Sequence, residues 1–301
     1  MITPEQLRSA VNDALGVALV QRVLHEFTLD DESLHALAPE GIFFEHAILL
    51  TIYRDLKNIS YDNLYKDIST WHRIAESTFK ENSKKIRRGL RLWAARILVP
   101  EDKSTLDKAA RRRKRPFPCN NVNLWIDTSD FAEEGERGLS RFDSRFSHKT
   151  MGAARKWLTI CDGKGRAQFV GGPHYPKHYD SDLLIHYAQR LHVIFADSTM
   201  IGDNHFLKAK DFLKRVRLIA PTSEAGRPAK DPITGEKRKH ELTEEEKLNN
   251  ELIRSVRATV EHPYNWLSNK FQSLYEVFRE DEDQHDCLVR FALACHRLSI
   301  N

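Results

Sequence analysis

The sequence predicts an α/β domain preceded by an all-helical region, and two observations carry this prediction. Through residue 100 the apolar residues recur with the period of a helix, as in the series Leu15, Leu19 and Val23. From residue 122 onward, short apolar runs alternate with turns and helical stretches. The chain has 301 residues, of which 41% are hydrophobic, so it can bury a substantial core.

Positive charge is concentrated in two segments, although the net charge is only +4. The first segment carries Lys84, Lys85, Arg87, Arg88 and Arg91. The second is a continuous basic run of Arg111, Arg112, Arg113, Lys114 and Arg115. Because each phosphate that a basic side chain neutralises releases counterions, both segments predict contact with double-stranded DNA.

Cysteine spacing and hydropathy exclude several kinds of protein. The four cysteines lack CxxC spacing, so we expect reduced thiols rather than a disulfide framework or a zinc site. No N-terminal stretch resembles a signal peptide, and Glu45 interrupts the apolar run at 42–53, so we expect neither secretion nor a membrane span. A basic run such as 111–115 also serves as a nuclear import signal, so we expect a nuclear protein in a eukaryote and a cytoplasmic one otherwise.

Residues 1–100 are expected to form a helical, DNA-binding region. Ser60 opens a short predicted helix, residues 69–74 form a turn, and a longer helix from Ala75 carries the first basic segment. This order is that of a helix-turn-helix, whose second helix enters the major groove of DNA. An ordinary helical bundle with a solvated basic face explains the pattern about equally well.

Residues 101–121 are expected to form a basic linker. They show no apolar periodicity, and Pro116 and Pro118 follow the basic run. Such a run is often a solvated tail, but here it also fits contact with the phosphate backbone.

After residue 121 the pattern predicts a sheet surrounded by helices. The expected strands are 122–126, 156–161, 167–170, 192–196 and 216–220. The expected helices are 182–191, one from about 205 to 213, and a long helix at 244–274. This order of elements is that of a ribonuclease-H-type fold, so residues 122–301 are expected to form such a domain with an exposed insertion at 222–247.

Three acidic positions in this domain are candidates for a catalytic site. Asp127 follows the first predicted strand, and sites tend to form at the carboxyl ends of strands. The second acid is Asp197, which follows the fourth predicted strand, or Asp203, and the sequence narrowly favours Asp197. The third is Glu261, on the long helix one turn after Arg257. Caps of turns and a surface ion pair are the ordinary alternatives for these residues.

Three carboxylates that converge from two strands and a helix can hold two divalent ions, Mg²⁺ or Mn²⁺. Two such ions cut or join phosphodiesters, because one activates the attacking oxygen and the other stabilises the leaving oxygen. Arg257 is expected to orient Glu261 or to contact a DNA phosphate. Other schemes fit less well, since the sequence contains no HExxH, GxSxG or P-loop pattern.

Short segments around these acids match a known family. The first is Asp127-Thr128-Ser129-Asp130, and the loop at 176–181 is a looser match. The second acid is offered by Gly202-Asp203 with Phe206, or by Ala196-Asp197 with Gly202. The most specific match consists of Arg257, Val260, Glu261, Tyr264, Lys270 and Phe271. Together these segments resemble the PIF/Harbinger superfamily of DDE transposases.

The resemblance implies a transposase or endonuclease that cuts DNA and joins it to a target. It implies two divalent ions held by Asp127, the second acid and Glu261, and a helical region at 45–95 that binds the ends of the element. It further implies a Myb-like accessory protein and a homodimer or larger assembly on DNA. The alternative is a domesticated DNA-binding or adaptor protein that keeps the fold without catalysis.

Overall fold

The structure is a computed structural model that describes residues 2–29, 44–68, 75–111, 115–134, 139–222, 242–257, 261–276 and 278–300. Within these ranges only the backbone is described for Thr28, Leu29, Phe44, Arg111, Glu261 and His262. In the described part of the chain, no helix is both long and apolar enough to cross a membrane.

The N-terminal third is helical, as predicted. Its elements are α1 (Pro4–Leu15), α2 (Val17–Leu29), α4 (Phe44–Lys57), α5 (Tyr61–Ile68) and α6 (Glu76–Ile97). The start of α1 is fixed by a capping box, in which Thr3 Oγ1 accepts from Gln6 N at 3.2 Å and Thr3 N donates to Gln6 Oε1 at 3.0 Å. Gly16, with φ +92°, separates α1 from α2.

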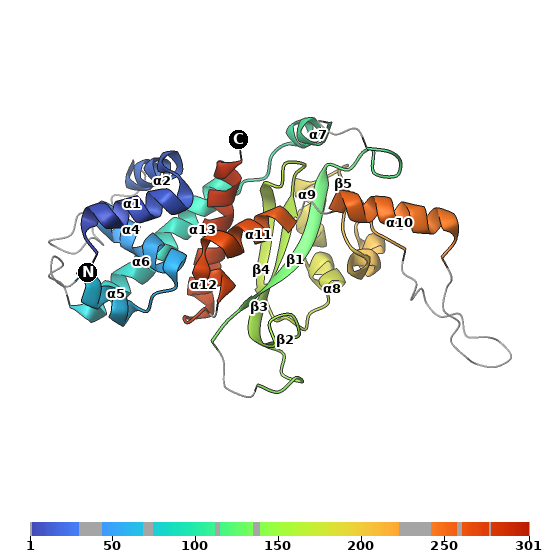
Figure 1. The fold of residues 1–301 in the computed structure, drawn as a ribbon. Coiled ribbons are helices and arrows are strands. Elements are labelled where there is room, and N and C mark those ends of the chain that lie inside the picture. The colour runs from blue at the N-terminus through green and yellow to red at the C-terminus, as the bar shows by residue number, and fades with distance from the viewer. Residues whose placement is uncertain are drawn as a thin grey trace.

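A six-stranded mixed sheet forms the centre of the rest of the chain (Figure 1). Its strands are β1 (Leu124–Ala132), β2 (Phe146–Ser147), β3 (Gly152–Cys161), β4 (Ala167–His174), β5 (Thr199–Ile201) and β6 (Arg217–Ile219). The order is β2-β3-β1-β5-β6, with β4 paired to β3. β3 lies antiparallel to β1 and β4, whereas β5 lies parallel to β1 and β6. The prediction of mixed helix and sheet is therefore confirmed.

Helices cover both faces of this sheet. One face packs against α7 (Lys103–Arg111), α8 (Asp180–His186), α9 (Ala188–Ile194) and the 3-10 helix η1 (Asn204–Phe212). The other face packs against α10 (Glu244–Arg257), α11 (Glu261–Lys270), α12 (Gln272–Tyr275) and α13 (Glu282–Ser299). Side chains alternate along β1, so Ile126 belongs to the first core and Phe131 to the second.

The C-terminal helix α13 joins the sheet to the N-terminal helices, and lies between them in Figure 1. It packs along α6, where the rings of Trp93 and Phe291 lie 5.8 Å apart. The buried residues of α1, α2, α4 and α6 form one core with those of α13 and with Trp157 of the sheet. Residues 1–100 thus share their core with the end of the described chain.

Three local predictions differ from the structure. The expected strand at 192–196 is wrong, because α9 extends to Ile194 and the next strand begins at Thr199. The expected linker at 101–121 contains α7, whose buried Leu106 packs under the sheet. The expected long helix to residue 274 is interrupted at Phe271, between α11 and α12. The continuity of this helix across 258–260 and most of the insertion at 222–247 lie outside the described residues.

Candidate active site

Asp127 lies within β1, whereas the sequence predicted a position directly after the end of that strand. The strand continues to Ala132, and Asp127 pairs with Thr159 of β3. By the alternation of a strand, Asp127 shares a face with Trp125 and Phe131, the face covered by α10 and α11. Its side chain is half-buried, and Oδ1 accepts a hydrogen bond from Thr128 N at 2.9 Å.

Asp203 lies just after the end of β5, at the position opposite Asp127 of the neighbouring strand β1. The parallel register pairs Trp125 with Ile201, so two residues further on the neighbouring strands present Asp127 and Asp203. A side chain on the intervening Gly202 would place its Cβ 2.8 Å from Ile126 Cγ2, so only glycine allows this approach. Asp203 also caps η1, because Oδ1 accepts from His205 N at 2.9 Å.

The environment of Asp127 favours its protonated form. Burial, with a smaller contribution from the charge of Asp203, raises the pKa of Asp127 from 3.8 to about 6. The hydrogen bond from Thr128 and the charges of Arg257 and Lys149 act in the opposite direction. The pKa of Asp127 is therefore raised mainly because its carboxylate is removed from water, and the like charge of Asp203 adds to this effect.

Arg257, the last residue of α10, lies next to this pair. Its Nη1 is 3.5 Å from Asp203 Oδ2, and both side chains are partly exposed. The end of α10 is fixed to the sheet because Trp125 Nε1 donates to Val256 O at 2.8 Å. An arginine is thus placed at the carboxylate pair by a contact with the same strand that carries Asp127.

Tyr264 fixes α11 to the sheet at Asp127. Its hydroxyl lies 3.4 Å from Asp127 O and 3.3 Å from Trp157 O, and can donate to either. The ring is buried and lies 6.1 Å from that of Phe131, edge to face. Glu261 is the first described residue of α11, three positions before Tyr264, and residues three apart share one helix face. The backbone of Glu261 is therefore one helical turn before Tyr264, the residue that contacts Asp127, while the side chain of Glu261 lies outside the described part.

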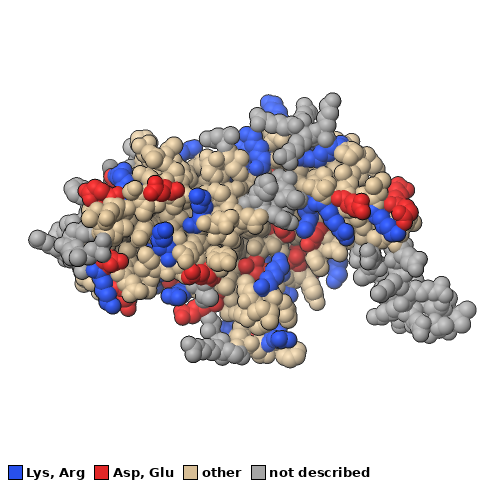
Figure 2. All heavy atoms as spheres, in the orientation of Figure 1, with Lys and Arg blue, Asp and Glu red and all other residues tan. Residues whose placement is uncertain are grey.

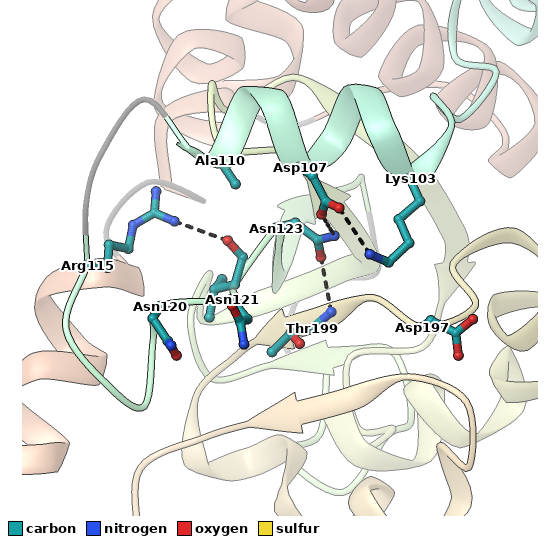
Figure 3. A pocket seen from close by; sticks show the side chains of 10 residues that line it. Lys103, Asp107, Ala110, Arg115, Asn120, Asn121, Asn123, Asp197 and Thr199 are labelled. Atoms are coloured by element: carbon teal, nitrogen blue, oxygen red, sulfur yellow. Dashed lines mark hydrogen bonds and ion pairs between the residues drawn. The ribbon is translucent and has the colours of Figure 1, made fainter.

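Asp197 lies elsewhere. It is exposed, adopts φ +61°, and precedes β5, six residues before Asp203. At about 3.3 Å per strand residue, this places it roughly 20 Å away along the sheet. It lines a polar cavity of about 560 Å³ with Lys103, Asp107, Arg115, Asn121 and Thr199 (Figure 3). The preference for Asp197 depended on a strand at 192–196 that does not form, and the register places Asp203 rather than Asp197 level with Asp127.

The basic residues of α6 form ion pairs with acidic side chains. Arg87 is only 1% exposed and its guanidinium binds Asp55 and Glu280, so its expected contact with DNA is wrong. The others form ion pairs at the surface: Lys84 with Asp281, Lys85 with Glu81, and Arg88 and Arg91 with Asp283. Arg91 also pairs with Asp286, whose side chain is buried. In the space-filling view, charges of both signs are interspersed over the helical half (Figure 2).

The basic run at 111–115 is described only in part. Arg112, Arg113 and Lys114 lie outside the described residues, as does the side chain of Arg111. Arg115 has a structural contact: Nη1 donates to Val122 O at 3.1 Å, and the guanidinium lies 4.5 Å from the centre of the Trp125 ring.

Sequence reasoning missed Lys149. Its Nζ lies 3.5 Å from Thr128 O, and its charge lowers the pKa of Asp127. No local pattern identifies it, because the turn before β3 brings it across to β1. Among the side chains that the structure describes, no group of three histidines, cysteines or acids has the geometry of a metal site, and Glu261 is not one of them.

The chain resembles known proteins in sequence and in fold. Residues 126–299, more than half of the chain, match the family described as "DDE superfamily endonuclease". A search of curated proteins found no match. Among solved structures, the chain resembles the piggyBac transposase in a cryo-EM structure of its synaptic complex with hairpin DNA. The alignment has a TM-score of 0.42 and 11% identity, and covers 99% of this chain and 76% of the other.

Proposed function

Because the chain belongs to the DDE superfamily endonuclease family, we propose that it is a metal-dependent DNA transposase or endonuclease whose acids are Asp127, Asp203 and Glu261. The observation that carries the proposal is the carboxylate pair on two parallel neighbours, with Asp127 inside β1 and Asp203 just after the end of β5. Arg257 and Tyr264, from the segment around Glu261, contact the same two residues.

The two aspartates suit hard divalent ions. Mg²⁺ and Mn²⁺ prefer oxygen ligands and take few carboxylates from the protein. Burial, and to a smaller extent the charge of Asp203, raises the pKa of Asp127, and bound cations would offset both effects. When bound, two such ions would activate the attacking oxygen and stabilise the leaving oxygen. Asp127 and Asp203 would hold them, with Glu261 as the third ligand.

The remaining residues of the site have positioning roles in this proposal. Tyr264 holds α11 on β1, so that Glu261 stays beside Asp127. Arg257 forms a partly exposed ion pair with Asp203. We propose that metal binding at Asp203 frees this guanidinium to contact a phosphate of the DNA, since arginine binds phosphate well.

The finer classification is also a proposal. An antiparallel β1-β3-β4 unit extended by the parallel strands β5 and β6 supports a ribonuclease-H-like domain at 122–301. Gly202, Asp203 and the buried Phe206 support a PIF/Harbinger-type second motif, because Phe206 packs where Gly202 leaves room.

We extend the proposal to partners. Double-stranded DNA is the substrate, a Myb-like protein assists, and the active form is at least a dimer located in the nucleus of a eukaryotic cell. Contacts from the helix-turn-helix layout of α5 and α6 would involve Lys84, Lys85 and Arg88, whose partners are exposed acids, and Arg91, which pairs with exposed Asp283 and buried Asp286. The basic run at 111–115 would add contacts to phosphates.

A plasmid-nicking assay tests the function. Purified protein with Mn²⁺ should nick supercoiled plasmid, and both Asp127→Asn and Glu261→Gln should abolish nicking. If the wild type fails to nick plasmid and DNA carrying the element's ends, but binds DNA in a salt-sensitive manner, the catalytic proposal is rejected. The chain is then a domesticated binding or adaptor protein.

A further inference from the structure

A cluster of exposed aromatic side chains lies on the segment between β4 and α8. Tyr175 is 41% exposed and Tyr179 is 69% exposed, and Phe142, from the segment before β2, is 92% exposed. Clustered large apolar side chains at the surface indicate a binding site. We call Phe142, Tyr175, Lys177, His178, Tyr179 and Lys208 the aromatic–lysine surface.

Cations lie against the aromatic rings of this surface. Lys177 Nζ is 6.0 Å from the centre of the Phe142 ring, and Lys208 Nζ is 5.2 Å from that of Tyr179. Within the described part of the chain, neither lysine forms a salt bridge; the charge of Lys177 acts on Asp143, whose carboxylate is already paired with Arg145. The surface therefore offers positive charge and exposed aromatic rings together, which fits a partner with both negative charge and flat apolar groups.

The segment that carries these rings is held in place from beneath. Lys156 of β3 is only 8% exposed, and its Nζ donates to His178 O at 2.9 Å and to Asp180 Oδ1 at 3.0 Å. The rings of Tyr175 and His178 are stacked, with centres 6.3 Å apart and planes 12° apart. Because Lys156 fixes the backbone beside Tyr179 before a ligand arrives, binding requires little ordering of this segment.

The aromatic–lysine surface is close to the proposed active site. Lys208 lies on η1, the helix that Asp203 caps, five residues after Asp203. At about 2 Å of rise per residue of a 3-10 helix, this separates them by roughly 10 Å. Contacts between α8 and η1 keep Tyr179 and Lys208 together. A DNA strand held at the acids can therefore reach the surface within a few nucleotides.

We propose that the aromatic–lysine surface binds unpaired nucleotides of the DNA strand beside the cut. Bases would stack on Tyr179 and Phe142, while Lys177 and Lys208 contact phosphates. The inference rests on the proposed nuclease function. Aromatic side chains stack with any base of a single strand. The bases of an intact duplex are already stacked on one another, so the surface should distinguish single strands from duplex.

Binding measured without metal tests this inference in the full-length chain. The probe is oligo-dT with one 2-aminopurine, and a duplex of the same length is the comparison. Phe142→Ala and Tyr179→Ala should each weaken single-strand binding by about tenfold and reduce the quenching of 2-aminopurine. Duplex affinity should stay unchanged. Tyr275→Ala is the matched control, because Tyr275 is 74% exposed but lies on α12.

Several results would overturn the inference. One is a loss of single-strand affinity in Tyr275→Ala as large as in the two test variants. Another is a loss of duplex affinity in Phe142→Ala and Tyr179→Ala that equals their loss of single-strand affinity. A third is single-strand affinity that neither Phe142→Ala nor Tyr179→Ala changes. Because the assay omits metal, its outcome is independent of catalysis. Metal-dependent plasmid nicking that persists beside unchanged single-strand binding would reject this surface and keep the nuclease proposal.

Discussion

The hydroxyl of Tyr264 lies 3.4 Å from the carbonyl oxygen of Asp127, and this contact joins the helix that carries Glu261 to the strand that carries the first acid. The acids come from elements far apart in sequence. Their relative placement therefore depends on contacts of this kind rather than on local chain geometry.

Tyr264→Phe should keep the packing of the ring and remove the hydrogen bond to the sheet. We expect stability to fall by about 1 kcal/mol, the net value of an ordinary hydrogen bond. Nicking should fall by a larger factor, because α11 is no longer fixed relative to Asp127. Denaturant unfolding and the plasmid assay measure the two effects. Tyr275→Phe, at an exposed tyrosine, should change neither.

Asp127→Asn should stabilise the metal-free protein at neutral pH while abolishing nicking. The folded-state pKa of Asp127 is raised to about 6 from 3.8, so the folded state binds the proton more tightly than the unfolded state. The resulting penalty is absent below about pH 4, grows as the pH rises toward 6, and is complete above it. Its size is roughly 2–3 kcal/mol at pH 7.

Urea unfolding in EDTA between pH 4 and pH 7.5 measures this effect. The free energies of unfolding of the wild type and Asp127→Asn should differ least at pH 4 and most above pH 6. A stability difference that is constant across the whole range would contradict the shifted pKa. Asp203→Asn serves as a comparison. Removing the charge of Asp203 should lower the pKa of Asp127, so that the loss of stability with rising pH occurs at lower pH.

Asp203→Asn and Asp197→Asn separate the two candidates for the second acid. Asp203→Asn should abolish metal-dependent nicking, because Asp203 is level with Asp127 across β1 and β5. Asp197→Asn should nick DNA at the wild-type rate, since Asp197 lines a cavity toward the other end of the strands. The reverse result would show that the acids are assembled differently when DNA and metal bind.

Gly202→Ala should damage the site without removing any charged group. The added methyl would lie 2.8 Å from Ile126 Cγ2 and 2.8 Å from Phe206 Cδ2, so the end of β5 must shift. We expect a loss of about 1–3 kcal/mol in stability and a marked loss of nicking. Gly152→Ala is the matched control, because a Cβ there meets nothing within 4 Å.

Arg87→Ala should unfold the helical region rather than weaken DNA binding by the folded protein. The guanidinium is buried against Asp55 and Glu280, and removing one partner of a buried ion pair costs about 3–5 kcal/mol. Lys85→Ala, which removes an exposed pair with Glu81, should cost less than about 0.5 kcal/mol. If Arg87→Ala stays fully folded and loses only DNA affinity, our assignment of Arg87 to the core is incorrect.

Local patterns predicted much of the fold. Apolar periodicity gave the N-terminal helices, and the turn at 162–165 gave the hairpin of β3 and β4. Periodicity could not separate strand from helix at 192–196, since a short apolar run fits both. It also missed α7, because a helix of nine residues shows too few turns for a clear period.

The pairing of Asp127 with Asp203 illustrates what sequence cannot supply. It depends on which strands are neighbours and on their register, and both are set by the packing of whole elements. Arg87 illustrates the same limit: a basic stripe on a helix looks solvated until the acidic partner, nearly 200 residues away, is known. In the sequence, Gly202-Asp203 with Phe206 was the local signal for Asp203 as the second acid, and this assignment stays a prediction.

The packing of α13 into the N-terminal core has a consequence for synthesis of the protein. The N-terminal helices cannot complete their hydrophobic core until residues 282–299 have been synthesised, because α13 contributes to that core. The core of the N-terminal helices is therefore completed only once residues 282–299 have left the ribosome, and until then apolar surface on α6 stays uncovered. A product interrupted before α13 would accordingly be aggregation-prone instead of partly active.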